Sequence, residues 1–461
     1  MINTDIDSQM KAKCSHILLM PVIAIIIAMT VSCGPQWKDE MLPYTPGGTD
    51  TGAPDREVET YTRKVLLLYS AGFNSISSYL KEDIGDLEDG WVPKLRKADD
   101  VLLVYSHQPK KRGQYSEMTE PVLFRMHSDN DGKIIKDTLI RYEAGTISAD
   151  AAQLNSVLTY VKDNFKAKSY GLIYSSHATG YLPSGFYSNP NGYFFDEEPL
   201  RQMSLQSAAT PVPVPYIDPT EDLGGPAVKS VGQDVHGQTA YETDIREFAE
   251  AIPMKLDYIL FDACLMGGIE VAYELAGKCD KVGFSQAEVL AEGFNYKTLT
   301  SHLLANRVES SPYDVCRDYF LQYDKMSGDD RSATISLVDC NRLDDLAKVC
   351  KELFGKYSDK ISRLNHNSVQ RFYRGGHHWF FDLQSILENV LIDEDESERL
   401  EAALANCIIY KGATPTFMPN YSGFNIDTFS GFSMYLPSYG HPELDRYYKT
   451  LKWNQATGLV K

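Results

Sequence analysis

The sequence predicts an α/β fold built on a mostly parallel sheet, and three observations support that expectation. The chain has 461 residues, 43% of them hydrophobic, which is ample material for a core. Helical patterns alternate with strand-like runs, as in layered α/β proteins. Six short apolar runs bounded by turn residues have the composition of buried parallel strands, at 65–69, 101–105, 171–175, 258–261, 282–285 and 333–338.

Two segments between these runs predict helices. Residues 151–165 carry Leu154, Leu158 and Val161 at helical spacing, with Asp150 as the N-cap. Residues 241–251 carry Ile245, Phe248 and Ala249 in the same way. Both helices connect strands of the expected sheet.

Other segments interrupt the alternation. Residues 122–126 and 134–140 flank an Asn-Asp-Gly turn and predict a hairpin. Residues 184–232 are rich in proline, glycine, serine and acidic residues, which is typical of a long exposed insertion. We therefore expect a core over 61–340, and a C-terminal α+β portion over 341–461, with a late strand near 431–436, packed on it.

The N-terminus has the pattern of a targeting segment. Lys11 and Lys13 precede an apolar run over 17–29, and small residues then lead to Cys33. The run is shorter than the roughly 20 apolar residues that span a membrane. It predicts a signal peptide over 1–32. The alternative is an uncleaved membrane anchor.

Cys33 resembles the lipid-modified cysteine of bacterial lipoproteins. A Lys-acidic cluster follows it and resembles a surface-export signal, and residues 33–60 then read as a flexible tether to the lipid anchor. The expected location is the outer membrane, at the cell surface.

Charge and cysteine spacing limit the partners and cofactors. The net charge of −18 argues against nucleic acid, which needs a basic patch. The eight cysteines form no C-x-x-C pair, so we expect no structural zinc. In an exported protein Cys340 and Cys350 could pair, and most of the eight cysteines are expected to be buried thiols.

A histidine and a cysteine each follow an apolar strand. His177 follows the run at 171–175, and Cys264 follows the run at 258–261. Because carboxyl ends of parallel strands share one crevice, the two side chains could meet there as nucleophile and base. Glycines behind both allow close backbone approach to a ligand. The alternative is that each is an ordinary buried residue.

The sequence resembles a known family in these two blocks. S-H-x-x-G at His177 and D-A-C-L-M-G at Cys264 are similar to the signature blocks of the clostripain family of cysteine peptidases. The resemblance covers most of 64–461, including 66–71 with Asn74, 285–288, 381–383 and 433–437. It implies a caspase-like three-layer α/β/α sandwich and a Cys-His dyad. The chain departs from the pattern at the insertion and near 365–378.

The resemblance also implies site roles. His177 would be the base and Cys264 the nucleophile, with the oxyanion bound by the N–H of Cys264 and one near Ala178–Gly180. Asp262 lies two residues before Cys264, on the same strand face if the strand continues. It would line a primary pocket for a substrate Arg or Lys, whereas its alternative is an N-cap. Glu288 and Glu292 would add charge to substrate binding.

Self-cleavage between the two blocks is a further implication. Of the basic residues there, Arg201 and Lys229 lie in the insertion, where a protease finds exposed chain. Small residues follow Lys229, so we favour it over Arg201. The alternative is a chain that works uncut.

The sequence therefore predicts an exported endopeptidase that cuts peptides after Arg or Lys. We expect no metal or required cofactor, although some members of the family need calcium and the sequence leaves that undecided. Two other functions remain open: a catalytically silent surface binding lipoprotein, and a non-peptidase thiol amidohydrolase.

Overall fold

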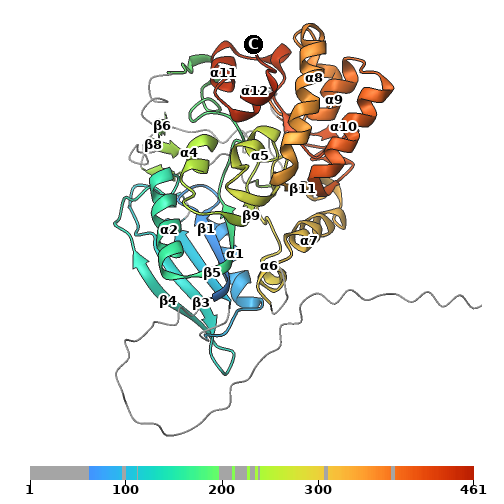
Figure 1. Ribbon diagram of the computed structural model, residues 1–461. Helices are drawn as coiled ribbons and strands as arrows, with labels where there is room; N and C mark the ends of the chain where they lie inside the picture. Colours follow the sequence, from blue (N-terminus) through green and yellow to red (C-terminus); the bar gives the residue numbers. More distant parts are fainter. Residues whose placement is uncertain are drawn as a thin grey trace, which may run out of the picture. The chain divides into compact units, whose positions relative to one another are not determined.

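A nine-stranded sheet organises the chain (Figure 1). The computed structural model describes residues 62–95, 100–111, 113–196, 210–212, 226–228, 234–236, 239–305, 310–374 and 379–461. The predicted signal peptide, Cys33 and the predicted tether lie outside the described residues. From Glu59 to Lys461 the chain forms one unit.

The sheet is mixed, with the order β13-β11-β10-β9-β5-β1-β2-β3-β4. Its five central strands, from β10 to β2, run parallel, and antiparallel pairs complete both edges. The bounds are β1 Thr62–Ala71, β2 Val101–His107, β3 Val122–Ser128, β4 Ile134–Arg141, β5 Ala167–Ser175, β9 Leu256–Asp262, β10 Cys279–Phe284, β11 Thr334–Asp339 and β13 Ile408–Ala413. All six predicted strands and the hairpin are confirmed.

Helices cover both faces of the sheet, because the central strands are apolar on both sides. The step from β1 to β2 and the step from β9 to β10 run in opposite directions across the sheet. Right-handed crossovers therefore place α1 and α5 on opposite faces. Helices α6 and α7 continue the α1 layer, and α2 and α4 continue the α5 layer (Figure 1). The three-layer α/β/α class is confirmed.

The helices of these layers, and those of the C-terminal portion, have the following bounds. They are α1 Ser77–Asp89, α2 Ala151–Asn164, α4 Ile245–Glu250, α5 Ile269–Leu275, α6 Tyr296–Leu303, α7 Pro312–Asp324, α8 Leu343–Ile361, α9 Leu383–Asn389, α10 Glu394–Cys407, α11 Pro442–Tyr448 and α12 Lys452–Thr457. Asp150 caps α2 as predicted, because its side chain accepts from Ala152 N.

The helix predicted over 241–251 begins later than expected. Asp244 accepts hydrogen bonds from the N–H groups of Arg246 and Glu247, so α4 starts at Ile245. The preceding β8 (Thr239–Glu242) pairs with β6 (Thr210–Val212) and β7 (Asp234–His236) in a small sheet. The first residues of the predicted helix are therefore strand, drawn into pairing with the insertion.

The C-terminal portion contributes to the main sheet, since its β13 forms one edge. The late strand predicted at 431–436 is reduced to β16 (Ser433–Met434), which pairs with β12 (Phe381–Asp382). A further pair, β14 (Thr416–Phe417) and β15 (Phe424–Asn425), lies apart from the main sheet.

The described cysteines are buried free thiols. The sulfurs of Cys279 and Cys340 lie 3.7 Å apart, because β10 and β11 are antiparallel neighbours. The sequence-based pairing of Cys340 with Cys350 is therefore not the arrangement in the structure.

Glu270 on α5 joins the main sheet layers to the C-terminal portion. Its fully buried Oε1 accepts from Tyr435 N at 2.9 Å and from Tyr448 Oη at 2.6 Å. Burial raises the pKa of Glu270 to about 7, although both hydrogen bonds lower it in part. The folded state thus holds this proton more tightly than the unfolded chain.

We expect Glu270→Gln to flatten the pH dependence of stability. The raised pKa gives stability that is complete below the ordinary value of 4.5 and is lost as the pH rises through about 7. Between about pH 5 and 8 the wild type should lose about 1–3 kcal/mol more than the variant. Denaturant unfolding measures this, with the exposed Glu388→Gln as control. Parallel curves for wild type and Glu270→Gln would contradict the assignment.

Candidate active site

The parallel pairing of β5 and β9 aligns the two residues singled out in the sequence. Ser175 and Asp262 are partners in this register, at the carboxyl ends of their strands. His177 and Cys264 each lie two residues further on, so they extend from the same level of the sheet. Both are buried, with exposed fractions of 3% and 0%.

The loop of the cysteine is held in an unusual backbone conformation. Leu265 has φ of 62°, in the left-handed region that side chains disfavour, and its N–H donates to Ala287 O at 2.9 Å. A Cβ on Gly180 would lie 2.5 Å from Leu265 O, so the loops of His177 and Cys264 are in backbone contact there. Such stored strain is common at functional sites.

The thiol of Cys264 is bound by the segment that follows β10. Val289 N donates to Cys264 Sγ at 3.0 Å, and Sγ lies 3.7 Å from Val289 O. A hydrogen bond to sulfur favours the thiolate, which is the reactive form. No pattern in the sequence pointed to Val289.

The ring of His177 contacts a residue that the sequence analysis did not single out. Ser75 Oγ lies 3.0 Å from His177 Nε2. The turn carrying Ser75 follows β1 and is fixed by Asn74, whose side chain donates to Ala71 O and accepts from Ile76 N. An Asx turn after the opening strand was the available signal.

Asp262 is a buried acid with hydroxyl partners. Its side chain is 1% exposed, and Oδ2 accepts from Tyr296 Oη at 2.7 Å and Ser175 Oγ at 3.2 Å. Burial first, and Asp262 second, raise the pKa of Tyr296 well above its ordinary value. Asp262 is not the cap of the next helix, because α5 begins at Ile269 with Gly268 at its N-cap.

The two glutamates named from the sequence lie in different surroundings. Glu288 is fully buried and forms an ion pair with Arg374, which accounts for both carboxylate oxygens. Glu292 is exposed on the turn after Ala291. Arg374 was missed because it is far from either block in sequence.

The insertion reaches both sides of the site through its described residues. Val228 forms an antiparallel bridge with Leu290, and Ala291 N donates to Ala227 O at 2.8 Å. Further along the chain, Val235 N donates to Phe73 O at 2.9 Å, and Phe73 lies two residues before Ser75. The predicted cleavage sites, Lys229 and Arg201, lie outside the described residues.

The region next to Val235 is anchored by a buried ion pair. Asp234 lies 3.4 Å from His107 Nδ1, with both side chains fully buried, and accepts from Ser148 N. The described residues on either side of 229–233 are therefore attached at two places. Val228 lies beside the segment that binds Cys264, and Val235 lies at the turn that carries Ser75.

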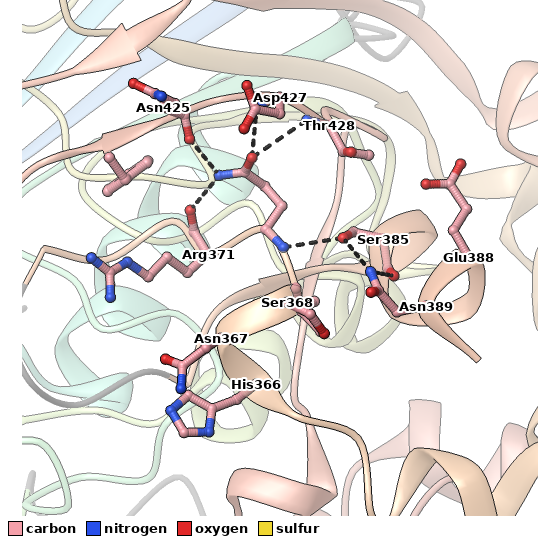
Figure 2. A pocket seen from close by; sticks show the side chains of 13 residues that line it. His366, Asn367, Ser368, Arg371, Ser385, Glu388, Asn389, Asn425, Asp427 and Thr428 are labelled. Atoms are coloured by element: carbon pink, nitrogen blue, oxygen red, sulfur yellow. Dashed lines mark hydrogen bonds between the residues drawn. The ribbon is translucent and has the colours of Figure 1, made fainter. Parts of the chain in front are cut away.

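A separate cavity of about 460 Å³ opens in the C-terminal portion (Figure 2). Gln370 closes one wall, because its amide donates to the carbonyls of Arg371 and Asn425 and accepts from the N–H groups of Asp427 and Thr428. Neither His177 nor Cys264 lines this cavity.

The described residues were compared with the requirements of a metal site and of a membrane-spanning helix. Within the described ranges, no cluster of three or more His, Cys, Asp or Glu side chains is arranged to hold a metal. Among the helices described, none is long and apolar enough to cross a bilayer. The acidic turn that carries Asp329 has a partner within the protein: the Asp329 carboxylate accepts hydrogen bonds from Asn420 N and Nδ2, each at 2.9 Å.

A cysteine and a histidine at adjacent carboxyl ends of an α/β/α sheet define a thiol-dependent hydrolase. The sequence model of the clostripain family, Peptidase_C11, matches residues 68–207 and 219–456. The chain belongs to this family, and it is a cysteine endopeptidase. No curated protein matches the chain.

Solved structures share the fold. An inactive zymogen C11 protease from Parabacteroides distasonis is 24% identical over 86% of this chain and 98% of its own, with a TM-score of 0.66. A secreted C11 cysteine protease from Bacteroides thetaiotaomicron is 24% identical over 86% and 99%, also with a TM-score of 0.66. The same kind of protease in complex with an irreversible peptide inhibitor is 22% identical over 86% and 99%, with a TM-score of 0.65.

Proposed function

We propose that this protein cuts peptide chains after Arg or Lys, with Cys264 as nucleophile and His177 as base. The observation that carries the proposal is the equal extension of both residues from the paired Ser175 and Asp262. Because Nε2 of His177 contacts Ser75, we expect proton transfer to use Nδ1.

The chemistry follows from these roles. His177 takes the thiol proton, and the thiolate attacks the substrate carbonyl. Backbone N–H groups of Cys264 and of the Ala178–Gly180 turn meet the oxyanion, each contributing about 3 kcal/mol. His177 then protonates the leaving amine, and water hydrolyses the acyl-enzyme.

We expect Cys264→Ala and His177→Ala each to abolish cleavage of fluorogenic peptides, because each removes one half of the dyad. Unchanged thermal unfolding would show that the fold persists. Cys350→Ala, which removes another buried thiol, is the matched control and should retain activity. Full activity in either dyad variant would end the assignment. Labelling of Cys264 by a thiol probe without any peptide cleavage would favour the binding-protein or amidohydrolase alternatives.

The buried carboxylate of Asp262 supports a preference for basic residues. Its position two residues before the nucleophile suits the base of a primary pocket, and the hydroxyls of Ser175 and Tyr296 hold its carboxylate there. A buried carboxylate at this position would attract the cationic side chain of an Arg or Lys substrate. The ion pair of Glu288 with Arg374 leaves that carboxylate already neutralised, so we give the specificity to Asp262, with exposed Glu292 as an outer contribution.

Asp262→Asn should lower cleavage after Arg and Lys by roughly 100-fold or more, while keeping the hydroxyl contacts. The loss arises because the substrate cation is left unpaired in a desolvated pocket. Kinetics on matched peptides with Arg, Lys or norleucine before the cleaved bond measure it. Asp100→Asn serves as control, because Asp100 is a buried acid that precedes β2, at the end of the parallel strands opposite to the dyad. Unaltered preference in Asp262→Asn would remove the pocket role.

The pairing of the insertion supports self-processing at Lys229, with Arg201 as second candidate. Ala227 and Val228 lie against Leu290 and Ala291 as an extended peptide adds to a strand. Cys264 is fully buried, as suits an uncut precursor, and the similar Parabacteroides distasonis protein is an inactive zymogen. On a denaturing gel with N-terminal sequencing of the fragments, wild-type fragments should begin at Ser230, and Cys264→Ala should stay intact. Fragments beginning at Gln202 would move the site to Arg201, and an active uncut wild type would exclude processing.

We further propose export as a surface lipoprotein anchored at Cys33. The apolar run before Cys33 supports this, and one similar protease is described as secreted. Cys33→Ala should move the protein from the membrane fraction to the soluble fraction, since a lipid chain supplies the binding. Cys14→Ala, upstream of the run, is the control. Unchanged partitioning would indicate an uncleaved anchor over 17–29.

A further inference from the structure

A buried ion pair lies beside the nucleophile. Arg374 Nε donates to Glu288 Oε2 at 2.7 Å and Nη2 donates to Oε1 at 3.1 Å, and both side chains are fully buried. Burying two charges is costly, and such pairs often contribute little net stability. The two-bond geometry instead fixes position, because the planar guanidinium holds a carboxylate in one orientation.

The glutamate of this pair belongs to the segment that binds Cys264. Its neighbour Val289 donates its N–H to Cys264 Sγ at 3.0 Å. On its other side, Ala287 O accepts from Leu265 N at 2.9 Å. The segment 287–289 therefore holds the cysteine loop at two points, and the Glu288 side chain anchors the segment from behind.

The same segment continues into the contact with the extended chain. Leu290 bridges Val228, and Ala291 N donates to Ala227 O. One short stretch thus contacts the nucleophile at one end and a bound strand at the other.

The ionisable groups around the Cys264 sulfur come from several elements of the chain. His177 comes from the loop after β5, Asp262 from β9, Glu288 from the segment 287–289, and Arg374 from the C-terminal portion. Tyr319 comes from α7, and burial first, then Asp262 and Cys264, raise the pKa of its hydroxyl. Burial lowers the pKa of Arg374, but Glu288, with smaller contributions that include Cys264, raises it above its ordinary value. The guanidinium offsets the negative charge that Glu288 would otherwise place near a thiolate.

We propose that Arg374 is a positioning residue for the nucleophile, holding Glu288 and thereby the Val289 N–H at the Cys264 sulfur. The inference rests on the proposed role of Cys264. It assigns to the C-terminal portion a direct part in setting the reactivity of a cysteine that lies more than one hundred residues earlier in the chain.

The test removes the pair without leaving one buried charge alone. In the double variant Glu288→Gln/Arg374→Met, kcat should fall about tenfold or more with a smaller change in KM, because the thiolate loses its N–H donor. The acid limb of the kcat/KM profile should move up by about one pH unit. Arg374→Lys keeps the positive charge but loses the two parallel N–H groups of the guanidinium. Its kcat and its pH profile should therefore lie between those of the wild type and the double variant.

A matched control is Arg246→Met. Arg246 also forms a largely buried ion pair, with Asp244, but its guanidinium lies against Thr450 and Tyr447. It should leave the pH profile unchanged. A folded double variant with wild-type kcat and pH profile would overturn the proposal, and so would an Arg246→Met variant with the same shift.

Two measurements do not depend on peptide cleavage. Hydrogen exchange of a peptide containing Val289 should quicken in the double variant and in Arg374→Lys, but not in Arg246→Met. Alkylation of Cys264 by iodoacetamide, followed by mass spectrometry across pH, should show the same upward shift. If these change while the wild type cleaves no peptide, the peptidase assignment fails and the role of Arg374 stands. If exchange at Val289 is unchanged in Arg374→Lys and in a folded double variant, the role of Arg374 fails.

Discussion

The parallel register between β5 and β9 is the constraint on which the site depends. It pairs Ser175 with Asp262, so that extensions of equal length carry His177 and Cys264 to one level. A slip of one residue would turn a whole strand face over and separate the pair. The strained Leu265 and the close approach of Gly180 to its carbonyl are contacts between the two extensions, so they exist only in this register.

Buried carboxylates around this register serve different ends because their partners differ. The contacts of Asp262 include hydrogen bonds from the hydroxyls of Ser175 and Tyr296. Glu288 is matched by a guanidinium and acts within the protein. Glu270, whose described partners are an N–H and a hydroxyl, has a raised pKa and links α5 to the C-terminal portion. The partner that each carboxylate meets decides whether it acts on a substrate, on a neighbouring loop or on stability.

The insertion and the residues directly after it are attached at two places near the dyad. Val228 lies against the segment that holds Cys264, while Asp234 and Val235 bind near the turn that carries Ser75. If the chain were cut between Val228 and Asp234, the part that begins after the cut would stay attached through the buried Asp234–His107 ion pair. Processing at Lys229 would therefore alter the cysteine side while the contact near Ser75 remains.

The sequence by itself determined the elements and the chemistry. Unbroken apolar runs predicted the central strands and Asp150 predicted a helix start, because these depend on local patterns. The blocks at His177 and Cys264 predicted the dyad through their resemblance to a known family. Tertiary structure decided what lies between distant residues: the start of α4, the neighbour of Cys340, the contact of Ser75 with His177 and the pairing of Glu288 with Arg374. From the sequence alone, Glu288 was expected to add charge for substrate binding, whereas the fold pairs it with Arg374. The physical reason is that desolvation makes a buried charge depend on its partner in space, and no local periodicity records that partner.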